Sequence, residues 1–391
     1  MRIYPNFYSE FSCIGGSCLG TCCEGWGITL DKTTLQKYQS ITSEFGTYIQ
    51  ECIQTDNTGS YIVLDSDMRC PFLNEDGLCK IYIQCGPEYL SDTCTRFPRR
   101  KLKMGEHQID GLSLSCEEVL QILYERESDI LLCADSTENL RENTYMESLV
   151  DFIAWHAAIL QDKSLPFGMV LGTVLYTSLT AGEQLRNHDY DGMDSTLQQY
   201  TDIYLELQQA QTQIFPHDWE TIASDFLFNL TDVFCQIIHE GNVFKSDLFL
   251  WDDSYFKKSD TERKEMFFLQ LSHRNKSLSH QAFMRRIAVA FLMGHYLELD
   301  VKETSVILLD KFCNYMLMAE ILPLTWNTDS TEGGAEYFSR LARICRLFDQ
   351  TGAMETLISP VVRDLFQPNE LTYTMAFMYL YNKCIQGDVK K

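Results

Sequence analysis

The sequence predicts an α+β protein: a small, irregular, cysteine-rich metal-binding module at the N-terminus, followed by an all-α helical domain. Ten of the fifteen cysteines lie within the first 116 residues, and glycine and small polar residues separate the first four. Beyond about residue 143, apolar residues recur at helical spacing without convincing strand alternation. No G-x-G-x-x-G motif lies between a strand and a helix, which argues against a Rossmann-type sheet. We therefore assign residues 1–135 to the module and residues 143–391 to the helical domain.

The first part of the module is expected to contain only short elements. Residues 1–12 are rich in aromatic side chains and predict an arm that packs against the cysteine loop. Residues 26–30 alternate like a strand, and Asp31 is a suitable N-cap for the helix that follows. Residues 61–64 predict a second short strand.

Turn-forming residues lie between Cys70 and Cys79. Segment 74–77 contains Asn, Asp and Gly, which favour a turn, so the two cysteines are expected to face each other across a hairpin-like structure. Residues 87–93 predict a short helix that delivers Cys94.

After Cys94 the sequence predicts one more strand and then mostly helices. Residues 107–114 predict another strand, and a helix is expected to begin at Glu117, whose carboxylate favours a helix N-terminus. The polar residues 135–144 and 323–334 predict a linker and a long loop. Apolar stripes at helical spacing cover 149–160, 166–186, 194–214, 219–240, 261–271, 280–298, 303–321, 335–349 and 368–385.

The charge and the N-terminus limit the function classes. A net charge of −23 argues against nucleic acid as a partner and suits a cationic one. The N-terminus lacks the apolar core of a signal peptide, and no stretch of about 18 apolar residues could span a membrane. We therefore expect a cytoplasmic protein without membrane association, in which thiols are reduced, and disfavour a disulfide framework.

The clustered cysteines are predicted to bind metal, because thiolates suit iron–sulfur clusters and zinc. The spacing is neither that of a zinc finger nor the ferredoxin run. Cys18 and Cys22 begin like a radical-type cluster motif, but Gly25 stands where that motif needs its third cysteine. Eight thiols exceed one four-ligand site, so either two metal sites exist or some thiols are buried without ligating. The predicted ligands are Cys13, Cys18, Cys22, Cys23, Cys70, Cys79, Cys94 and Cys116.

Four segments carry a resemblance to a known family. They read Tyr4-Pro-x-Phe-Tyr, Cys13-Ile-Gly-x-x-Cys18-x-x-x-Cys22-Cys23-x-Gly-Trp26, Cys70-Pro-Phe-Leu-Asn-Glu-Asp-Gly-Leu-Cys79-x-Ile-Tyr and Leu90-Ser-x-Thr-Cys94-x-x-Phe-Pro-Arg99. These segments resemble the bacterial flagellin lysine-N-methylase family over about residues 1–125. The resemblance implies S-adenosylmethionine-dependent methylation of flagellin lysines by a protein with an iron–sulfur cluster, expected to be of the 4Fe–4S type, with zinc as the other candidate.

The family also carries Ser-Arg, two further residues and Glu-His near its C-terminus. This chain reads Cys345-Arg346-Leu347-Phe348-Asp349-Gln350 at the best-matching place, so the histidine is replaced by Gln350. The resemblance implies Asp349 as proton acceptor or orienting group and Arg346 as partner of the donor's carboxylate. The sequence does not locate the methyl-donor pocket. The alternative function is a non-enzymatic zinc- or iron-chelating module that binds another protein.

Overall fold

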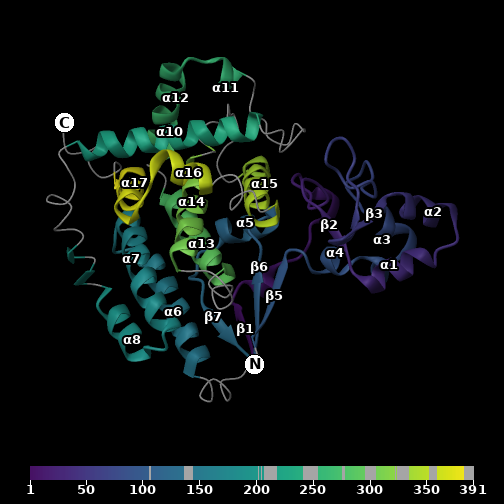
Figure 1. Cartoon of the computed structure of the whole chain (residues 1–391), viewed down its shortest axis with the longest axis horizontal. Coiled ribbons are helices and arrows are strands. Elements are labelled where there is room, and N and C mark those ends of the chain that lie inside the picture. The colour runs from purple at the N-terminus through teal and green to yellow at the C-terminus, as the bar shows by residue number, and fades with distance from the viewer. Residues whose placement is uncertain are drawn as a thin grey trace.

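A computed structural model places a cysteine-rich module beside a larger helical body (Figure 1). The structure describes residues 1–104, 107–135, 144–200, 202–203, 205–206, 218–240, 254–274, 278–295, 305–321, 323, 334–351 and 359–382. Most of the predicted linker 135–144 and of the predicted loop 323–334 lies outside these residues.

The N-terminus is part of a sheet in the helical body. The strand order is β5 (Arg99–Met104), β6 (His107–Leu112), β1 (Arg2–Pro5), β7 (Leu132–Ala134). β1 pairs in parallel with β6 and antiparallel with β7. The predicted arm at residues 1–12 is therefore a strand and a 3-10 helix, η1 (Tyr8–Glu10). The sequence did not predict this strand because its pairing partner β6 lies about a hundred residues away along the chain.

The second sheet belongs to the cysteine module, which we define as residues 23–98. Its three strands have the order β2-β4-β3, all antiparallel. Asp31 caps the first helix as predicted: its carboxylate accepts the Thr34 hydroxyl at 2.6 Å and the Thr34 N–H at 2.9 Å, and these hydrogen bonds lower its pKa to about 2. Elements in and beside the module are η2 (Gly15–Ser17), β2 (Ile28–Leu30), α1 (Lys32–Gln39), α2 (Glu44–Glu51), β3 (Ile53–Asp56), β4 (Gly59–Ile62), α3 (Lys80–Cys85), η3 (Pro87–Tyr89) and α4 (Asp92–Arg96).

Helices make up the rest of the described chain, which confirms the prediction of a helical domain after residue 143. Among the described residues, neither sheet is a doubly wound parallel one, and no strand occurs beyond β7. No described helix combines the length and the apolar character that a membrane span needs. The helices are α5 (Glu117–Glu125), α6 (Thr144–Gln161), α7 (Phe167–Arg186), α8 (Tyr190–Gln198), α10 (Trp219–Glu240), α11 (Ser254–Lys257), α12 (Asp260–Arg274), α13 (Leu278–His295), α14 (Ser305–Ile321), α15 (Ala335–Thr351), α16 (Ser359–Phe366) and α17 (Glu370–Asn382).

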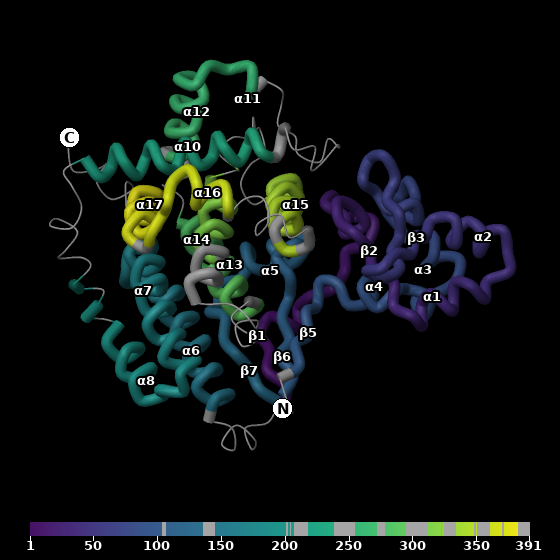
Figure 2. The backbone as a smooth tube through the Cα atoms, in the orientation of Figure 1, coloured from purple at the N-terminus to yellow at the C-terminus, as the bar shows by residue number. Residues whose placement is uncertain are grey.

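The structure has two hydrophobic cores, and their boundary differs from the domain boundary predicted from the sequence. The large core joins the body helices with side chains of β1, β6 and α5, such as Ile3 and Ile109. The core of the cysteine module is separate and small: Ile28, Leu30, Tyr38, Ile49, Ile62, Cys70, Phe72 and Ile81. The chain enters the module after η2 and returns from it into β5 (Figure 2). A division into independent domains at residues 135 and 143 stays a prediction.

The buried histidine of α6 makes the stability of the fold depend on pH. His156 is fully buried, with Nδ1 2.7 Å from the Phe152 carbonyl oxygen and Nε2 3.0 Å from Thr177 Oγ1. Burial lowers its pKa from 6.5 to about 4. The unfolded chain therefore takes up this proton below about pH 6.5, while the folded protein does so only near pH 4.

Stability should fall across this pH window. Between pH 7.5 and 5.0 the wild type is expected to lose about 2 kcal/mol more unfolding free energy than His156→Gln, which has no such group. Urea unfolding of both proteins at the two pH values measures the difference. Parallel losses in the two proteins would contradict the assignment.

Candidate metal centre and its junction with the helical body

Every cysteine in the described part of the chain is a free thiol. The eight predicted ligands fall into two groups by position. We call Cys23, Cys70, Cys79 and Cys94 the module thiols, because they belong to the cysteine module. We call Cys13, Cys18, Cys22 and Cys116 the junction thiols, because they lie where the cysteine loop (residues 13–26) meets the body.

The module thiols are brought together by backbone pairing. The Cys70 N–H donates to the Cys23 carbonyl oxygen at 2.7 Å, and Leu73 forms an isolated bridge with Cys79. Gly77 closes the intervening turn with a φ of +72°, a conformation that favours glycine. The predicted turn at residues 74–77 is thereby confirmed. Cys94 follows from the short helix α4, and the Ser91 hydroxyl accepts its N–H at 3.1 Å.

The four module thiols lie near enough to one another to affect each other's pKa values. Burial raises the pKa of Cys70, Cys79 and Cys94, the last to about 11. Cys23 raises all three pKa values further. Cys79 also raises the pKa values of Cys70 and Cys94, and Cys94 raises that of Cys70. Backbone N–H groups act in the opposite direction, with Phe72 on Cys70 and Tyr82 on Cys79. Such N–H groups favour thiolate, the form that ligates metal.

The junction thiols have a different environment, which includes charged side chains. Burial raises the pKa of Cys18, and Glu117 and Cys116 raise it further. Burial also raises the pKa of Cys116 to about 11, which Arg346 partly offsets. Burial lowers the pKa of Arg346, and Cys22 counteracts this. A buried guanidinium thus lies near three of the four junction thiols.

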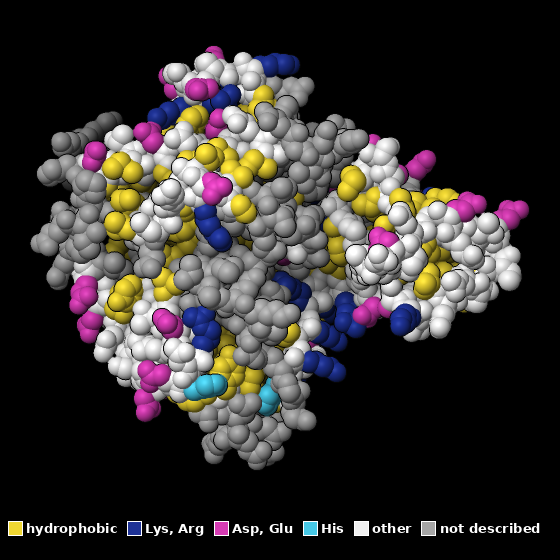
Figure 3. Space-filling view, in the orientation of Figure 1, with side chains coloured by type: hydrophobic (Ala, Val, Ile, Leu, Met, Phe, Trp, Pro, Cys, Tyr) yellow, Lys and Arg dark blue, Asp and Glu magenta, His cyan; other side chains and the backbone are white. Residues whose placement is uncertain are grey.

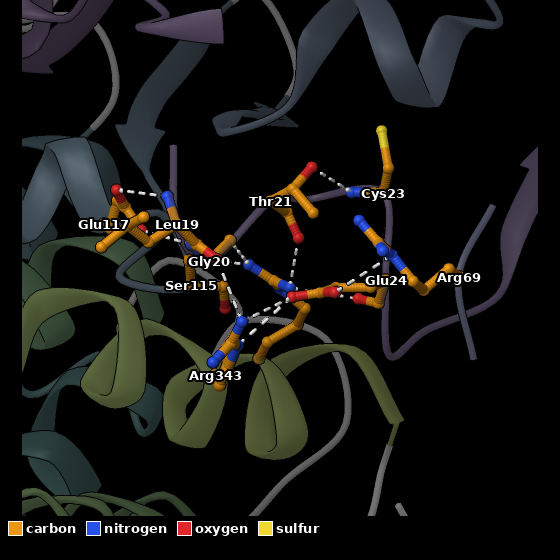
Figure 4. A network of polar contacts seen from close by, with 10 residues as sticks. Leu19, Gly20, Thr21, Cys23, Glu24, Arg69, Ser115, Glu117 and Arg343 are labelled. Carbon is orange, nitrogen blue, oxygen red and sulfur yellow. Dashed lines mark hydrogen bonds and ion pairs between the residues drawn. The ribbon is translucent and has the colours of Figure 1, made fainter. Parts of the chain in front are cut away.

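The glutamate at the start of α5 holds the cysteine loop from one side. The Glu117 carboxylate, 4% exposed, accepts the N–H groups of Leu19 at 3.0 Å and Gly20 at 2.5 Å (Figure 4). A Cβ atom on Gly20 would lie 3.0 Å from both Glu117 Oε2 and Ser339 Oγ. The loop therefore passes between α5 and α15 at a position where a side chain has no room.

Arg346 holds the same loop from α15. Arg346 is only 3% exposed, and its guanidinium donates to the carbonyl oxygens of Gly20 and Thr21 at 2.7 Å each. It also donates to the carbonyls of Glu24 and Ser115 at 3.1 Å each. Four backbone acceptors from two segments converge on one side chain. The buried Nε–H of Arg346 has no acceptor in the described part of the chain, so the site has one unused donor.

An ion-pair network joins the module, the loop and α15. Glu24, 5% exposed, accepts from Arg343 Nη2 at 3.0 Å, and Arg343 Nη2 also donates to the Leu19 carbonyl at 3.0 Å (Figure 4). Arg69 Nε lies 3.9 Å from the other oxygen of Glu24. Sequence reasoning missed Glu24 and Arg343; the only available signal was a carboxylate directly after the paired cysteines.

Asp349, predicted to be catalytic, lies beside the turn between β6 and α5. Its Oδ2 accepts the hydroxyls of Ser113 and Ser115, each at 3.1 Å. Asp349 and Arg346 thus both contact the segment that precedes Cys116. Their catalytic roles stay predictions, and their contacts give them a positioning role in the structure.

The chemistry of the thiols fits a metal, although their side chains stand apart. Four sulfur donors in each group match the ligand number of a tetrahedral zinc or iron–sulfur site. Within the described residues, no three His, Cys, Asp or Glu side chains converge closely enough to hold a metal ion. The unused Nε–H of Arg346 is suited to an anionic group at the junction thiols.

Comparison with known proteins identifies relatives. The chain is 40% identical over 121 residues to the flagellar biosynthetic protein FliU of Salmonella muenchen, a match covering 29% of this chain and 72% of the relative. Lysine-N-methylases of Salmonella typhimurium and Salmonella choleraesuis match at the same identity and length, but the match spans only 30% of each. No family model matches the chain, and no solved structure does. The matches, together with the predicted segments, show that the chain belongs to the bacterial flagellin lysine-N-methylase family.

Proposed function

We propose that this protein transfers a methyl group from S-adenosylmethionine to lysine side chains of flagellin, and that it carries an iron–sulfur cluster at the junction thiols. The match to two proteins named lysine-N-methylase carries the proposal of the reaction. The flagellar name of the third relative supports flagellin as substrate.

The reaction requires a neutral lysine amine in line with the methyl carbon of the donor. Free lysine has a pKa near 10.4, so at pH 7 only about one side chain in 2,500 is neutral. A drier pocket and the positive sulfonium of the donor both lower that pKa. The net charge of −23 attracts a lysine-bearing substrate before this step, and acidic side chains are spread over the visible face (Figure 3).

We place the cluster at the junction thiols because the buried Arg346 guanidinium lies near three of them. Thiolates and an iron–sulfur cluster are anionic, and Arg346 supplies a buried cation with an unused N–H donor. Lys and Arg side chains also gather on the surface between body and module (Figure 3). When bound, the cluster would supply an iron able to hold the donor's amino and carboxylate groups. Glu117 and Arg346 keep the loop that presents Cys18 and Cys22 in position.

Methyl transfer to flagellin tests the proposal. Anaerobically purified protein is incubated with methyl-labelled S-adenosylmethionine and flagellin, and mass spectrometry counts methylated lysines. We expect transfer by the wild type, retention in Cys52→Ser, and a loss of at least about 100-fold in Cys18→Ser. Flagellin from cells without the protein should also lack the modification. Unchanged methylation in those cells, together with no transfer in vitro, would leave the chelating protein-binding module as the function.

A further inference from the structure

The edge strand β5 carries an inference about how the protein substrate is held. We propose that an acidic, extended segment of the substrate protein adds to the free edge of β5 as a further strand, next to the lysine to be methylated. The identity of the partner rests on the proposed function. The binding of an acidic strand at this edge can be tested without methyl transfer.

The main chain of β5 is open on one side. β5 is the outermost strand of its sheet, and no described strand pairs with its other side (Figure 1). Just before the strand, the Ser113 N–H donates to the Pro98 carbonyl oxygen at 2.8 Å. Residues of an antiparallel pair alternate between those that exchange hydrogen bonds with the partner strand and those that do not. Along this register the N–H and C=O groups of Arg99, Lys101 and Lys103 therefore point away from β6, where a further strand can pair with them.

The edge is basic in an acidic protein. Residues 96–103 contain five of the chain's 32 Lys and Arg and no Asp or Glu, although the net charge is −23. Lys101 and Lys103 are exposed and lie on the same face of the strand, because side chains alternate. The residue opposite Lys101 is Asp110, which is 2% exposed and already accepts from Arg2 Nε at 2.5 Å. Within the described residues neither lysine forms an ion pair, so positive charge runs along the edge.

Lysines at a sheet edge also have a simple protective role. They keep neutral and basic strands from pairing there, which prevents aggregation. The same charges favour a strand that carries carboxylates, because opposite charges on directly opposing residues stabilise a strand pair and like charges destabilise it. The edge is therefore selective for an acidic segment, which the net negative charge of the rest of the protein repels.

The start of β5 lies at the junction between the cysteine loop and the helical body. Ser113, which bonds to the Pro98 carbonyl, donates its hydroxyl to Asp349 at 3.1 Å. Two residues further on, the Ser115 carbonyl accepts from Arg346 at 3.1 Å, and Arg346 also holds the cysteine loop. An added strand that follows β5 to its first residue therefore ends at this junction.

The spacing of the lysines limits which substrate lysines are suitable. A strand advances by about 3.4 Å per residue, so Lys101 and Lys103 lie about 7 and 14 Å from Arg99. A target lysine at the start of β5 would have its acidic residues on the same face of the added strand. We expect them at alternate positions, within about six residues of the methylated lysine.

Binding of a synthetic peptide to the full chain tests the proposal. The probe is a fluorescein-labelled peptide in which Glu alternates with Val and Thr, and the reference peptide has Lys in place of Glu. Fluorescence anisotropy should show at least about tenfold tighter binding of the acidic peptide, lost in about 1 M salt. The double variant Lys101→Glu, Lys103→Glu should bind the acidic peptide at least about tenfold more weakly. Lys163→Glu, at an exposed lysine elsewhere in the body, should bind it like the wild type.

Two further measurements separate strand addition from misfolding and from general attraction of anions. The double variant should bind the lysine peptide more tightly than the wild type does, which a misfolded protein would not. In the complex with the acidic peptide, hydrogen exchange of the β5 amides should slow. Exchange in β3, an edge strand without Lys or Arg, should stay unchanged.

Three outcomes would overturn the proposal: equal binding of both peptides, binding without protection of β5, or tighter binding of an oligothymidine of equal charge. The last would mean that the surface recognises phosphates. Peptide binding without any methyl transfer would refute only the proposed function. Transfer to flagellin with an unchanged KM in the double variant would refute only the role of the edge.

Discussion

Replacing Arg346 by methionine is expected to lower the free energy of unfolding by about 3–5 kcal/mol and to release iron from the junction thiols. Methionine fills much of the same volume but donates no hydrogen bond. Four carbonyl oxygens, among them those of Gly20 and Ser115, would then lose their shared donor in a buried place. Buried acceptors without a partner are costly, because they have also lost water.

Arg285 provides a matched control for this prediction. It is 6% exposed and donates to the carbonyl oxygens of Leu160, at 2.8 Å, and Leu165, at 2.6 Å, within the helical body. Arg285→Met should cost a similar free energy yet leave iron per chain unchanged. Arg346→Lys should fall between, because an ammonium lacks the planar fork that reaches both loop and turn. Urea unfolding and iron analysis give both quantities. Equal iron content in Arg346→Met and Arg285→Met would remove the special role of Arg346 at the metal.

The helices were largely predictable, because apolar residues recur along them at helical spacing. The predicted stripe at 166–186 corresponds to α7, and that at 219–240 to α10. Local chemistry also predicted the Asp31 cap and the turn at 74–77. The strands β1, β3, β5 and β7 escaped prediction because they are only three to six residues long. In addition, β1 pairs with β6 and β7, which lie about a hundred residues or more away along the chain.

The metal ligands of the candidate site stay a prediction, and the residues that hold the cysteine loop in place were not predictable from the sequence. Clustered cysteines are visible in a sequence, whereas the target of a buried guanidinium is not. Arg346 was expected to meet a donor carboxylate, yet its contacts are with carbonyls more than two hundred residues away. Glu117 looked like an ordinary residue at a helix N-terminus and is also the acceptor for two loop N–H groups. Both roles depend on the packing of α15 against α5, which no local pattern encodes.

Chelation of the metal predicted for the module thiols is expected to unfold the cysteine module while the helical body stays folded. Binding of a structural zinc supplies roughly 10–16 kcal/mol of apparent free energy, comparable with the whole stability of an ordinary domain. The module has little else to hold it, since its core is small and separate from the large one. Its attachments through Glu24 to Arg343 and through Arg346 involve the loop rather than the strands.

Hydrogen exchange read by mass spectrometry can follow each part of the chain in this experiment. After chelation, amides of β2 and β4 should exchange at least about a thousandfold faster, which corresponds to about 4 kcal/mol of lost protection. Amides of α7, which lies in the large core, should keep their rates and serve as the internal control. Cys79→Ser should show the fast module exchange without a chelator, and Cys52→Ser should need the chelator. Unchanged protection of β2 and β4 in the metal-free protein would mean that burial of eight apolar residues suffices to fold the module, and would contradict a structural role for the predicted metal.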